Sequence, residues 1–326
     1  MPALHWTLDA AQQATDSIDL RHLVGAAVGN PVVVCHPEPT DDPAGWGQVA
    51  EALRPLAVVL IAEGSRPDPM TAWADLVTEQ TVEASEAIVE HQTAATIAAQ
   101  VLRHRPPDAA TARLLESLAY ATLQAGADHQ RWIAARGRRV RADRSSRVAL
   151  HDDTHQLRLR LTRGRLHNLI DHRMRNELAE ALITIDLDPD QRPVIWEADG
   201  PSFCAGGDPA EFGTVPDSTT AHTIRSSADL APWFDRIADR LTVRIDGPCV
   251  GAGIELAALA GTISAGPEAR FRLPELTLGL IPGAGGTWSI PNRIGRQRTL
   301  EWLVLDQELD PSTAHRWGLV DELRGS

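Results

Sequence analysis

The sequence predicts an α/β protein, and three patterns support this prediction. Two short apolar runs rich in β-branched residues, at 31–35 and 56–62, are bounded by Pro, Asp and Gly, as buried strands are. Alanine-rich segments with apolar residues at helical spacing occupy much of 70–139. From residue 157 onward, strand, helix and strand patterns follow one another, which favours stacked layers joined by crossover connections. A chain of 326 residues, 43% of them hydrophobic, is long enough for about two domains.

The first half of the chain is predicted to begin as an α/β segment and to continue as helices. Between the two apolar runs, the segment 45–56 (GWGQVAEALRPL) is predicted to be helical. Further along, Pro106 and Pro107 interrupt the helical pattern. Asp108 is therefore a candidate N-cap for the helix that follows.

An arginine-rich stretch at 136–147 has no apolar periodicity and is the best candidate for a linker. We therefore expect an N-terminal extension, residues 1–147, and a second part, residues 148–326. The second part opens with three predicted elements, which are a half-buried strand (157–163), an amphipathic helix (174–185) and a strand leading into a glycine-rich turn (194–198).

The composition argues against several classes of function. With 31 basic and 44 acidic residues the formal net charge is -13, so the protein as a whole repels nucleic acid and anionic membranes. Every basic residue is an arginine, which excludes Schiff-base lysine chemistry and a P-loop lysine. No export signal or membrane-spanning run is recognisable. The cysteines form no CxxC pair, which argues against a disulfide framework or zinc site and fits a reducing cytoplasm; they are Cys35, Cys204 and Cys249.

Three glycine-containing segments carry the candidate chemistry. The first, FCAGGDPAEF at 203–212, follows a predicted strand, and its paired glycines allow the backbone to approach a ligand or simply to turn. In the second, VRIDGPCVGAGIELAALAGTISAG at 243–266, a Gly-Ala-Gly turn leads into a helix with Glu255 in its first turn. Glu255 is either a capping carboxylate or a buried functional acid. In the third, FRLPELTLGLIPGAGGTWSIPNRIG at 271–295, Glu275 precedes a loop of glycines and prolines.

These segments, taken in order, resemble the signature stretches of a known family. FCAGGD, GPCVGAGIELA, FRLPELTLGLIPGAGGT and AHRWGLVDEL are similar to four signatures of the crotonase (enoyl-CoA hydratase/isomerase) superfamily. LTRGRLHNLIDHRMRNELAEAL resembles the family's opening strand and helix, with Asn168 and Ile170 at its usual Asn and Leu positions. The resemblance covers about 155–323. It implies a crotonase-like core of ββα units and a homo-oligomer, either a trimer or a hexamer. To this core the chain adds an N-terminal α/β and helical extension.

The resemblance also implies a reaction site for acyl thioesters of coenzyme A. By motif position, the backbone N–H groups of Gly207 and Ala252 would form an oxyanion hole for the thioester carbonyl. Glu255 and Glu275 occupy the positions of the family's acid/base pair. We expect hydration of a 2-enoyl-CoA to a 3-hydroxyacyl-CoA, with Glu255 activating water and Glu275 supplying the proton. Alternatives are isomerisation, thioester hydrolysis, decarboxylation, C–C bond chemistry, or a catalytically silent CoA-ester-binding subunit.

Further contacts to the substrate are expected from the same region. Arg163 and Arg165, at the end of the predicted first strand, are candidates for the phosphates of CoA, or else solvated surface residues. We expect no permanently bound cofactor, because CoA belongs to the substrate, and no metal, because HDDTH at 151–155 lacks a third ligand. Cys204 is expected to be a packing residue. The glycine turns should contribute further substrate contacts, from Ala205, Gly206, Asp208 and Gly251.

The chain departs from the family at both ends. Family members usually continue beyond GLVDEL with helices that cover the site and pack on a neighbouring subunit, whereas here about 150 residues precede the signatures. We hypothesise that residues 70–142 take over the covering and oligomerising role, in an arrangement similar to a circular permutation. Alternatively, the extension is an independent domain for a partner such as a carrier protein or a neighbouring enzyme.

Overall fold

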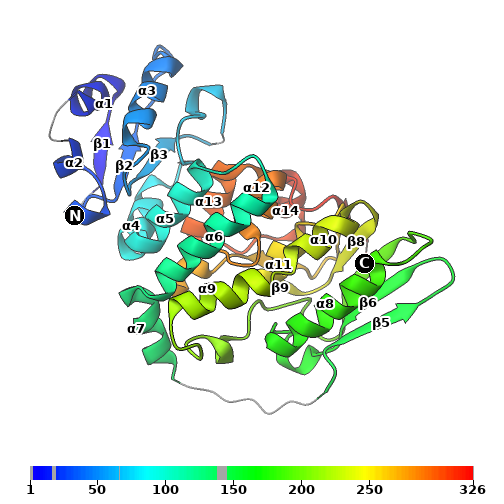
Figure 1. Cartoon of the computed structure of the whole chain (residues 1–326). Helices are drawn as coiled ribbons and strands as arrows, with labels where there is room; N and C mark the ends of the chain where they lie inside the picture. The colour runs from blue at the N-terminus through cyan, green and yellow to red at the C-terminus, as the bar shows by residue number, and fades with distance from the viewer. Residues whose placement is uncertain (1–2, 17–19, 66, 138–144, 326) are drawn as a thin grey trace.

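The computed structural model describes residues 3–16, 20–65, 67–137 and 145–325. Figure 1 shows two sheets with helices packed around and between them. The first sheet has four parallel strands in the order β1-β2-β3-β4, and β2 and β3 confirm the two strands predicted from the apolar runs. The strands are β1 (Leu4–Trp6), β2 (Val32–Cys35), β3 (Val59–Glu63) and β4 (Leu76–Thr78).

The helices of the first half surround this sheet and continue beyond it. The helix predicted at 45–56 is confirmed as α3, and Asp108 is the N-cap of α6, because its carboxylate accepts a hydrogen bond of 2.9 Å from the N–H of Thr111. The helices are α1 (Leu8–Thr15), α2 (Leu20–Leu23), α3 (Pro43–Leu53), α4 (Thr81–Glu90), α5 (Gln92–Arg103), α6 (Ala109–Gln124) and α7 (Ala127–Arg136).

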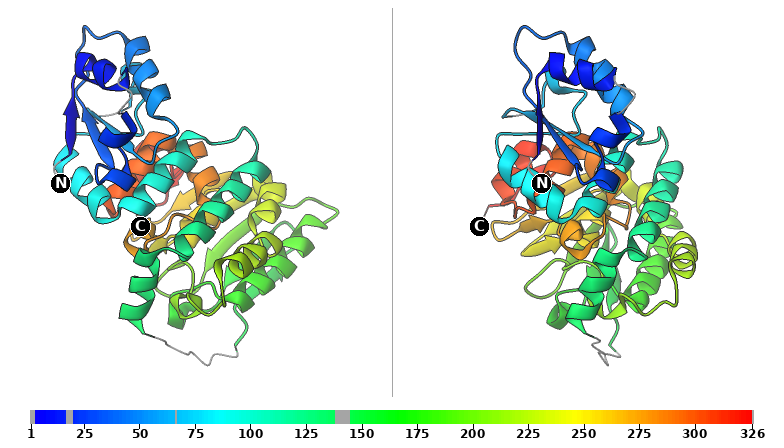
Figure 2. Two further views of the ribbon diagram at one scale, coloured as in Figure 1. Left: turned by 60° about the vertical axis from the view of Figure 1, so that its left-hand side comes forward. Right: turned by 90° about the vertical axis from the view of Figure 1, so that its left-hand side faces the viewer.

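The two faces of the first sheet pack against different cores. Successive side chains of a strand point to opposite faces, so alternate residues of β2 and β3 separate. Val33 and Leu60 join Trp46 of α3 in a small outer core. Val34 and Ile61 face the other way and belong to the main core of the molecule. The first sheet therefore lies between its own helices and the rest of the protein (Figure 2).

The second part is built on a six-stranded sheet in the order β12-β10-β8-β7-β6-β5. The strands pair in parallel, except β5 with β6, which are antiparallel. The parallel strands β9 and β11 form a further small sheet. The strands are β5 (Val148–Asp152), β6 (Leu157–Leu161), β7 (Val194–Ala198), β8 (Leu241–Ile245), β9 (Pro248–Val250), β10 (Thr262–Ala265), β11 (Arg270–Arg272) and β12 (Glu322–Leu323).

Helices cover the second sheet and connect its strands. The predicted strand at 157–163 is confirmed as β6, in which alternate residues are buried, and the helix predicted at 174–185 is confirmed as α8. The helices are α8 (His172–Asp186), α9 (Ser218–Ser227), α10 (Ala231–Ile237), α11 (Ala252–Ala257), α12 (Gly286–Ile294), α13 (Arg296–Leu305) and α14 (Pro311–Trp317). Within the described residues no helix is both long and apolar enough to cross a membrane.

The middle of the chain holds the predicted linker and the histidine-containing segment HDDTH. The predicted linker at 136–147 lies mostly outside the described residues. HDDTH at 151–155 follows that linker, and the structure places its first two residues at the end of β5 and the others in the turn to β6. In the described ranges, no group of three or more His, Cys, Asp or Glu residues is arranged to hold a metal ion.

The helices α4 to α7 are integral to the molecule. Buried residues of α5 and α6, such as Leu102 and Leu123, belong to the same core as Leu273 and Ile290 of the second part. Figures 1 and 2 show α6 and α9 side by side over the turn that precedes α11. A helix from the first half therefore lies beside the turns that carry the predicted chemistry.

Candidate active site

A cavity of about 580 Å³ lies where the glycine-containing segments of the second part meet helices of the first half. Its walls include the turns at 205–209, 250–256 and 274–284. Tyr120 and Gln124 of α6 and Trp132 of α7 also line it. Two segments far apart in the sequence therefore build one site.

The structure brings Glu255 and Glu275 to this cavity as the sequence predicted. Glu255, in the first turn of α11, is 2% exposed, and its Oε2 accepts hydrogen bonds from the N–H groups of Ala284 (2.7 Å) and Gly286 (3.0 Å). Glu275 begins the 3₁₀ helix η6 (Glu275–Leu278) and is 7% exposed. Its Oε2 is buried without a hydrogen-bond partner among the described residues. A Cβ at Gly251 would lie 2.7 Å from Oε1 of Glu275, so this position needs a glycine.

Burial makes both carboxyl groups hold their protons more tightly than in water. For Glu255, loss of solvation raises the pKa well above its ordinary value, and the negative charges of Glu275 and Glu116 raise it further. For Glu275, burial raises the pKa to about 8, and the charges of Asp306 and Glu116 add to this effect. Because two neighbouring buried carboxyls resist being charged together, the pair favours keeping a proton near neutral pH.

Two backbone N–H groups beside the glutamates have no acceptor among the described residues. On either side of Gly207, the O of Gly206 accepts from the N–H of Ile170 and the N–H of Asp208 donates to the O of Ile170, whereas the N–H of Gly207 has no acceptor within the described residues. Ala252 starts α11, so its N–H precedes the helical ladder. Gly206, with a φ of +88°, packs closely on the second turn, because a Cβ on it would lie 3.1 Å from the O of Val250. The two turns therefore lie against each other in the cavity wall.

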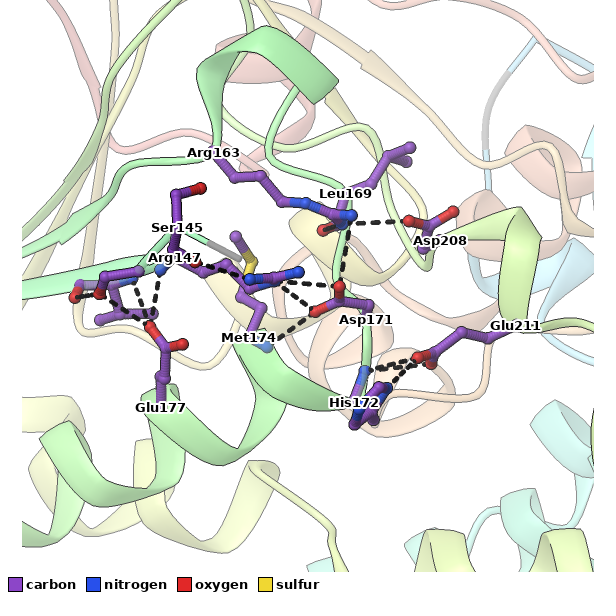
Figure 3. Close-up of polar contacts among 12 residues, drawn as sticks. Ser145, Arg147, Arg163, Leu169, Asp171, His172, Met174, Glu177, Asp208 and Glu211 are labelled. Atoms are coloured by element: carbon purple, nitrogen blue, oxygen red, sulfur yellow. Dashed lines mark hydrogen bonds and ion pairs between the residues drawn. The ribbon is translucent and has the colours of Figure 1, made fainter. Parts of the chain in front are cut away.

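The expectation that Arg163 binds CoA phosphates is corrected by the structure. Its side chain is 3% exposed, and Nη1 donates to Asp208 Oδ2 (3.0 Å) and to the O of Leu169 (2.7 Å). Nη2 lies 3.3 Å from Asp171, which also pairs with Arg147 (Figure 3). A buried guanidinium is stable when carboxylates compensate it, and this network directs Arg163 inward, away from a phosphate in solvent.

The other residues singled out in the sequence differ in whether they reach the cavity. Asp208 lines the cavity, but its carboxylate is held by Arg163 and by the N–H of Ala210, so it serves the turn. Arg165 is exposed. Cys204 is confirmed as a buried residue, and its Sγ lies 3.2 Å from the O of Asn168. The remaining predicted contacts line the cavity through their backbone and small side chains, and these are Ala205, Gly206 and Gly251.

A third buried glutamate, Glu116 of α6, was not predicted from the sequence. Its Oε1 accepts from the N–H of Gly285 (2.8 Å), and its Oε2 accepts from the N–H (2.8 Å) and hydroxyl (2.7 Å) of Thr287. Glu255 binds the N–H groups of residues 284 and 286, so the two carboxylates hold alternate amides of one turn. Burial raises the pKa of Glu116 to about 7. Nothing in the helical pattern around residue 116 signals this contact, because its partners are about 170 residues away.

Tyr120, the one tyrosine of the sequence, was also missed. Its ring packs against Gly283 so closely that a Cβ there would collide with it, and the guanidinium of Arg225 stacks on it at 4.4 Å. Burial raises the pKa of its hydroxyl, and the charges of Glu255 and Glu275 add to that rise. Tyr120 therefore lies beside the acid pair and lines the cavity from the first half of the chain.

Helix α7 closes another side of the same cavity. Trp132 lies 5.7 Å, between ring centroids, from Phe212 of the first glycine segment. The Nδ1 of His129 is 2.8 Å from the O of Leu278 in η6, and His129 itself is buried. Helices α6 and α7 thus point toward Glu255 and Glu275.

Residues 156–325 match the sequence family described as enoyl-CoA hydratase/isomerase. This chain belongs to that family. The resemblance to the crotonase superfamily and the predicted fold class are thereby confirmed, and a crystal structure of enoyl-CoA hydratase from Thermoplasma volcanium GSS1 agrees with them. That structure matches with a TM-score of 0.52 and 25% identity over 56% of this chain and 73% of its own.

Curated relatives of this family match parts of the chain. The enoyl-CoA isomerase/hydratase fer4 of Mycosarcoma maydis is 34% identical over 137 residues, which are 42% of this chain and 50% of that protein. The cyclohexa-1,5-dienecarbonyl-CoA hydratase of Thauera aromatica is 32% identical over 177 residues, 54% of this chain and 67% of that protein. The chain therefore spans about half to two thirds of the length of these relatives.

Proposed function

We propose that this protein is an acyl-CoA enzyme of the hydratase type, which adds water to the C2–C3 double bond of a 2-enoyl-CoA and catalyses the reverse dehydration. One observation carries the proposal: Glu255 and Glu275 are buried in one cavity beside the N–H groups of Gly207 and Ala252, for which the described part of the chain offers no acceptor. Membership of a family whose relatives are named hydratases and isomerases of CoA esters supports it.

In the proposed reaction the thioester carbonyl accepts hydrogen bonds from the N–H groups of Gly207 and Ala252. The carboxylate of Glu255 removes a proton from water, and the water oxygen bonds to C3. Electrons of the double bond shift toward the thioester oxygen, and C2 takes the proton of Glu275. Each preorganised N–H donor lowers the barrier by about 3 kcal/mol, because the negative charge develops on the oxygen it faces.

The different surroundings of the two glutamates support this division of roles. Two N–H groups donate to Glu255 and favour the charged form that a base requires, against the burial that raises its pKa. In contrast, Oε2 of Glu275 is buried with no donor among the described residues, and the pKa of this group is raised to about 8. A carboxyl of that pKa is protonated at neutral pH and can serve as the acid.

The remaining expectations stay proposals that follow from the family. CoA would be bound as part of the substrate, and no permanently bound cofactor or metal takes part. Arg165 remains a candidate for the CoA phosphates. Arg175 of α8 joins it, because it lines the cavity and its Nε has no hydrogen-bond partner in the described part of the chain. A cytoplasmic location, a homo-oligomer, and the replacement of the family's C-terminal helices by residues 70–142 belong to the same proposal.

The test is to incubate the protein with crotonyl-CoA and a small panel of enoyl-CoA esters, and to follow loss of the conjugated thioester absorbance and gain of one water by mass. Glu275→Gln should lower kcat by at least about a hundredfold and still bind the ester, as measured by calorimetry. Unchanged turnover in this variant would remove Glu275 from the mechanism. Failure of the wild-type protein on every ester, with binding retained, would favour a silent CoA-ester-binding subunit.

Isomerisation is a second candidate because Oε2 of Glu275 has no donor in the part of the chain that the structure describes. A single base of this kind could carry a proton between C2 and C4 of an enoyl-CoA without water. A 3-enoyl-CoA offered to the protein would then become conjugated with no gain of mass. In that case Glu255→Gln should retain far more activity than Glu275→Gln, whereas hydration requires both glutamates.

A further inference from the structure

One wall of the cavity carries an arginine that the proposed hydration does not use. Arg225 of α9 lines the cavity together with Tyr120 and Gln124 of α6. Its Nε donates to the hydroxyl of Ser117 (3.1 Å), Nη1 donates to Oε1 of Gln124 (3.1 Å), and Nη2 donates to the O of Ser117 (3.2 Å). Its guanidinium plane is thus held in a fixed position against the ring of Tyr120.

The positive charge of Arg225 is not matched by a carboxylate. All three of its acceptors are neutral oxygens, and in the described part of the chain no Asp or Glu lies within ion-pair distance of it. Asp229 also lines this cavity, but its carboxylate is 3.1 Å from Nε of Arg113. Both oxygens of Glu116 are occupied by Gly285 and Thr287. A partly buried cation without a counter-charge is costly, and an anion in the cavity would compensate it.

The hydrogen-bonding capacity of Arg225 fits a carboxylate. A guanidinium has five N–H groups, and the three bonds above leave one on each terminal nitrogen. The two oxygens of a carboxylate can accept both, which gives the paired geometry that arginine prefers. We infer that the acyl group of the substrate carries a second carboxylate, which Arg225 binds, so that the substrate class is CoA monothioesters of short dicarboxylic acids. This inference rests on the proposed binding of acyl-CoA in the cavity.

The position of Tyr120 places this carboxylate at the far end of the acyl group. The ring of Tyr120 contacts both the guanidinium of Arg225, which stacks on it, and Gly283, which adjoins the turn that holds Glu255. Arg225 is held from the side of α6, by Ser117 and Gln124. An anionic group bound by Arg225 would therefore belong to the end of the acyl group remote from C2 and C3.

The experiment compares two saturated esters that cannot be hydrated. Glutaryl-CoA ends in a carboxylate, and pentanoyl-CoA has a methyl group in its place. We expect calorimetry to give a dissociation constant about tenfold or more lower for glutaryl-CoA with the wild-type protein. Arg225→Gln, which keeps a donor for Ser117, and Arg225→Met should both reduce this ratio to about one. Using two variants keeps the test decisive if one of them fails to fold.

Two further arginines serve as controls. Arg236→Met alters an exposed arginine that stacks on Trp233 and pairs with Asp186, and it should keep the wild-type ratio. Arg175→Met should weaken both esters together if Arg175 binds a phosphate of CoA. Equal affinity of the wild-type protein for both esters would overturn the inference, and so would an Arg225 variant that keeps the preference, or a preference that is lost through Arg175 instead.

These measurements separate the inference from the proposed reaction. If glutaryl-CoA is preferred through Arg225 but no enoyl-CoA is hydrated, the substrate class stands and the reaction is wrong. If crotonyl-CoA is hydrated but glutaryl-CoA is not preferred, the reaction stands and the reading of Arg225 as a carboxylate site is wrong.

Discussion

Two regions of the molecule each place a buried carboxylate on the same turn, yet they come from opposite halves of the chain. Glu255 lies in a glycine-rich signature of the second part and binds the N–H groups of residues 284 and 286. Glu116 lies in a plain helix of the first half and binds those of residues 285 and 287. Glu255 reaches the cavity with the predicted oxyanion turn, whereas Glu116 does not line it. Similar burial and similar partners thus support a chemical role in one case and a positioning role in the other.

The largest effect should come from Glu255→Gln, which tests the chemical side of this comparison. If Glu255 is the base, its loss should lower kcat for hydration by about a thousandfold, because water is no longer deprotonated as it attacks. Stopped-flow absorbance with crotonyl-CoA would measure this loss. Glu180→Gln, at an exposed position on α8, is the control and should behave as wild type. A small effect at Glu255 would show that the two carboxylates of the turn are alike.

Glu116→Gln should have a smaller effect, of about tenfold on kcat, with KM nearly unchanged. It loosens the turn that orients Glu255 without removing a reacting group. It should also move the pH–rate profile to lower pH, because the charge of Glu116 raises the pKa values of both Glu255 and Glu275. A fall in kcat without a shift in the profile would indicate a general loss of packing and contradict the positioning role.

The free energy of unfolding should depend on pH less steeply in Glu116→Gln than in the wild-type protein. The pKa of Glu116 in the folded state, about 7, lies above its ordinary value of 4.5. Between these values the folded state holds a proton that the unfolded state has released, so stability falls as pH rises from about 4.5 to 7. The contribution is about 1.4 kcal/mol per pH unit for one group. Urea unfolding across this range should show a shallower slope for Glu116→Gln than for wild type, whatever the absolute stability, and an identical slope would contradict the raised pKa.

The smallest effect is expected for Tyr120→Phe, which removes one hydroxyl from the wall supplied by the first half. The ring still fills the space against Gly283 and Arg225, so binding should persist. We expect kcat/KM to fall by less than about tenfold, because at most one neutral hydrogen bond to a bound substrate is lost. Tyr120→Ala should cost much more, since it leaves a cavity beside the acid pair. Equal losses in both variants would assign the hydroxyl a direct part in the reaction.

Much of the second part could be predicted because its information is local. Alternating side chains predicted β6, and the apolar period of residues 174–185 predicted α8. The glycine turns around Gly206 and Gly251 could be recognised because close backbone approach and positive φ require that residue. The ordered signatures then placed Glu255 and Glu275 in one site, and the structure puts both in the same cavity.

The sequence by itself therefore determined several of the strands and helices, the glycine turns and the family, because each depends on residues close together in the chain. The tertiary structure decided which side chains from elsewhere complete the site. Arg163 looked available at a strand end, but Asp171 and Asp208 draw it inward. The helical pattern around Glu116 predicts no role for it, but it meets a turn about 170 residues away. Contacts over such separations leave no local period, and only the packing of α6 over the second part reveals them.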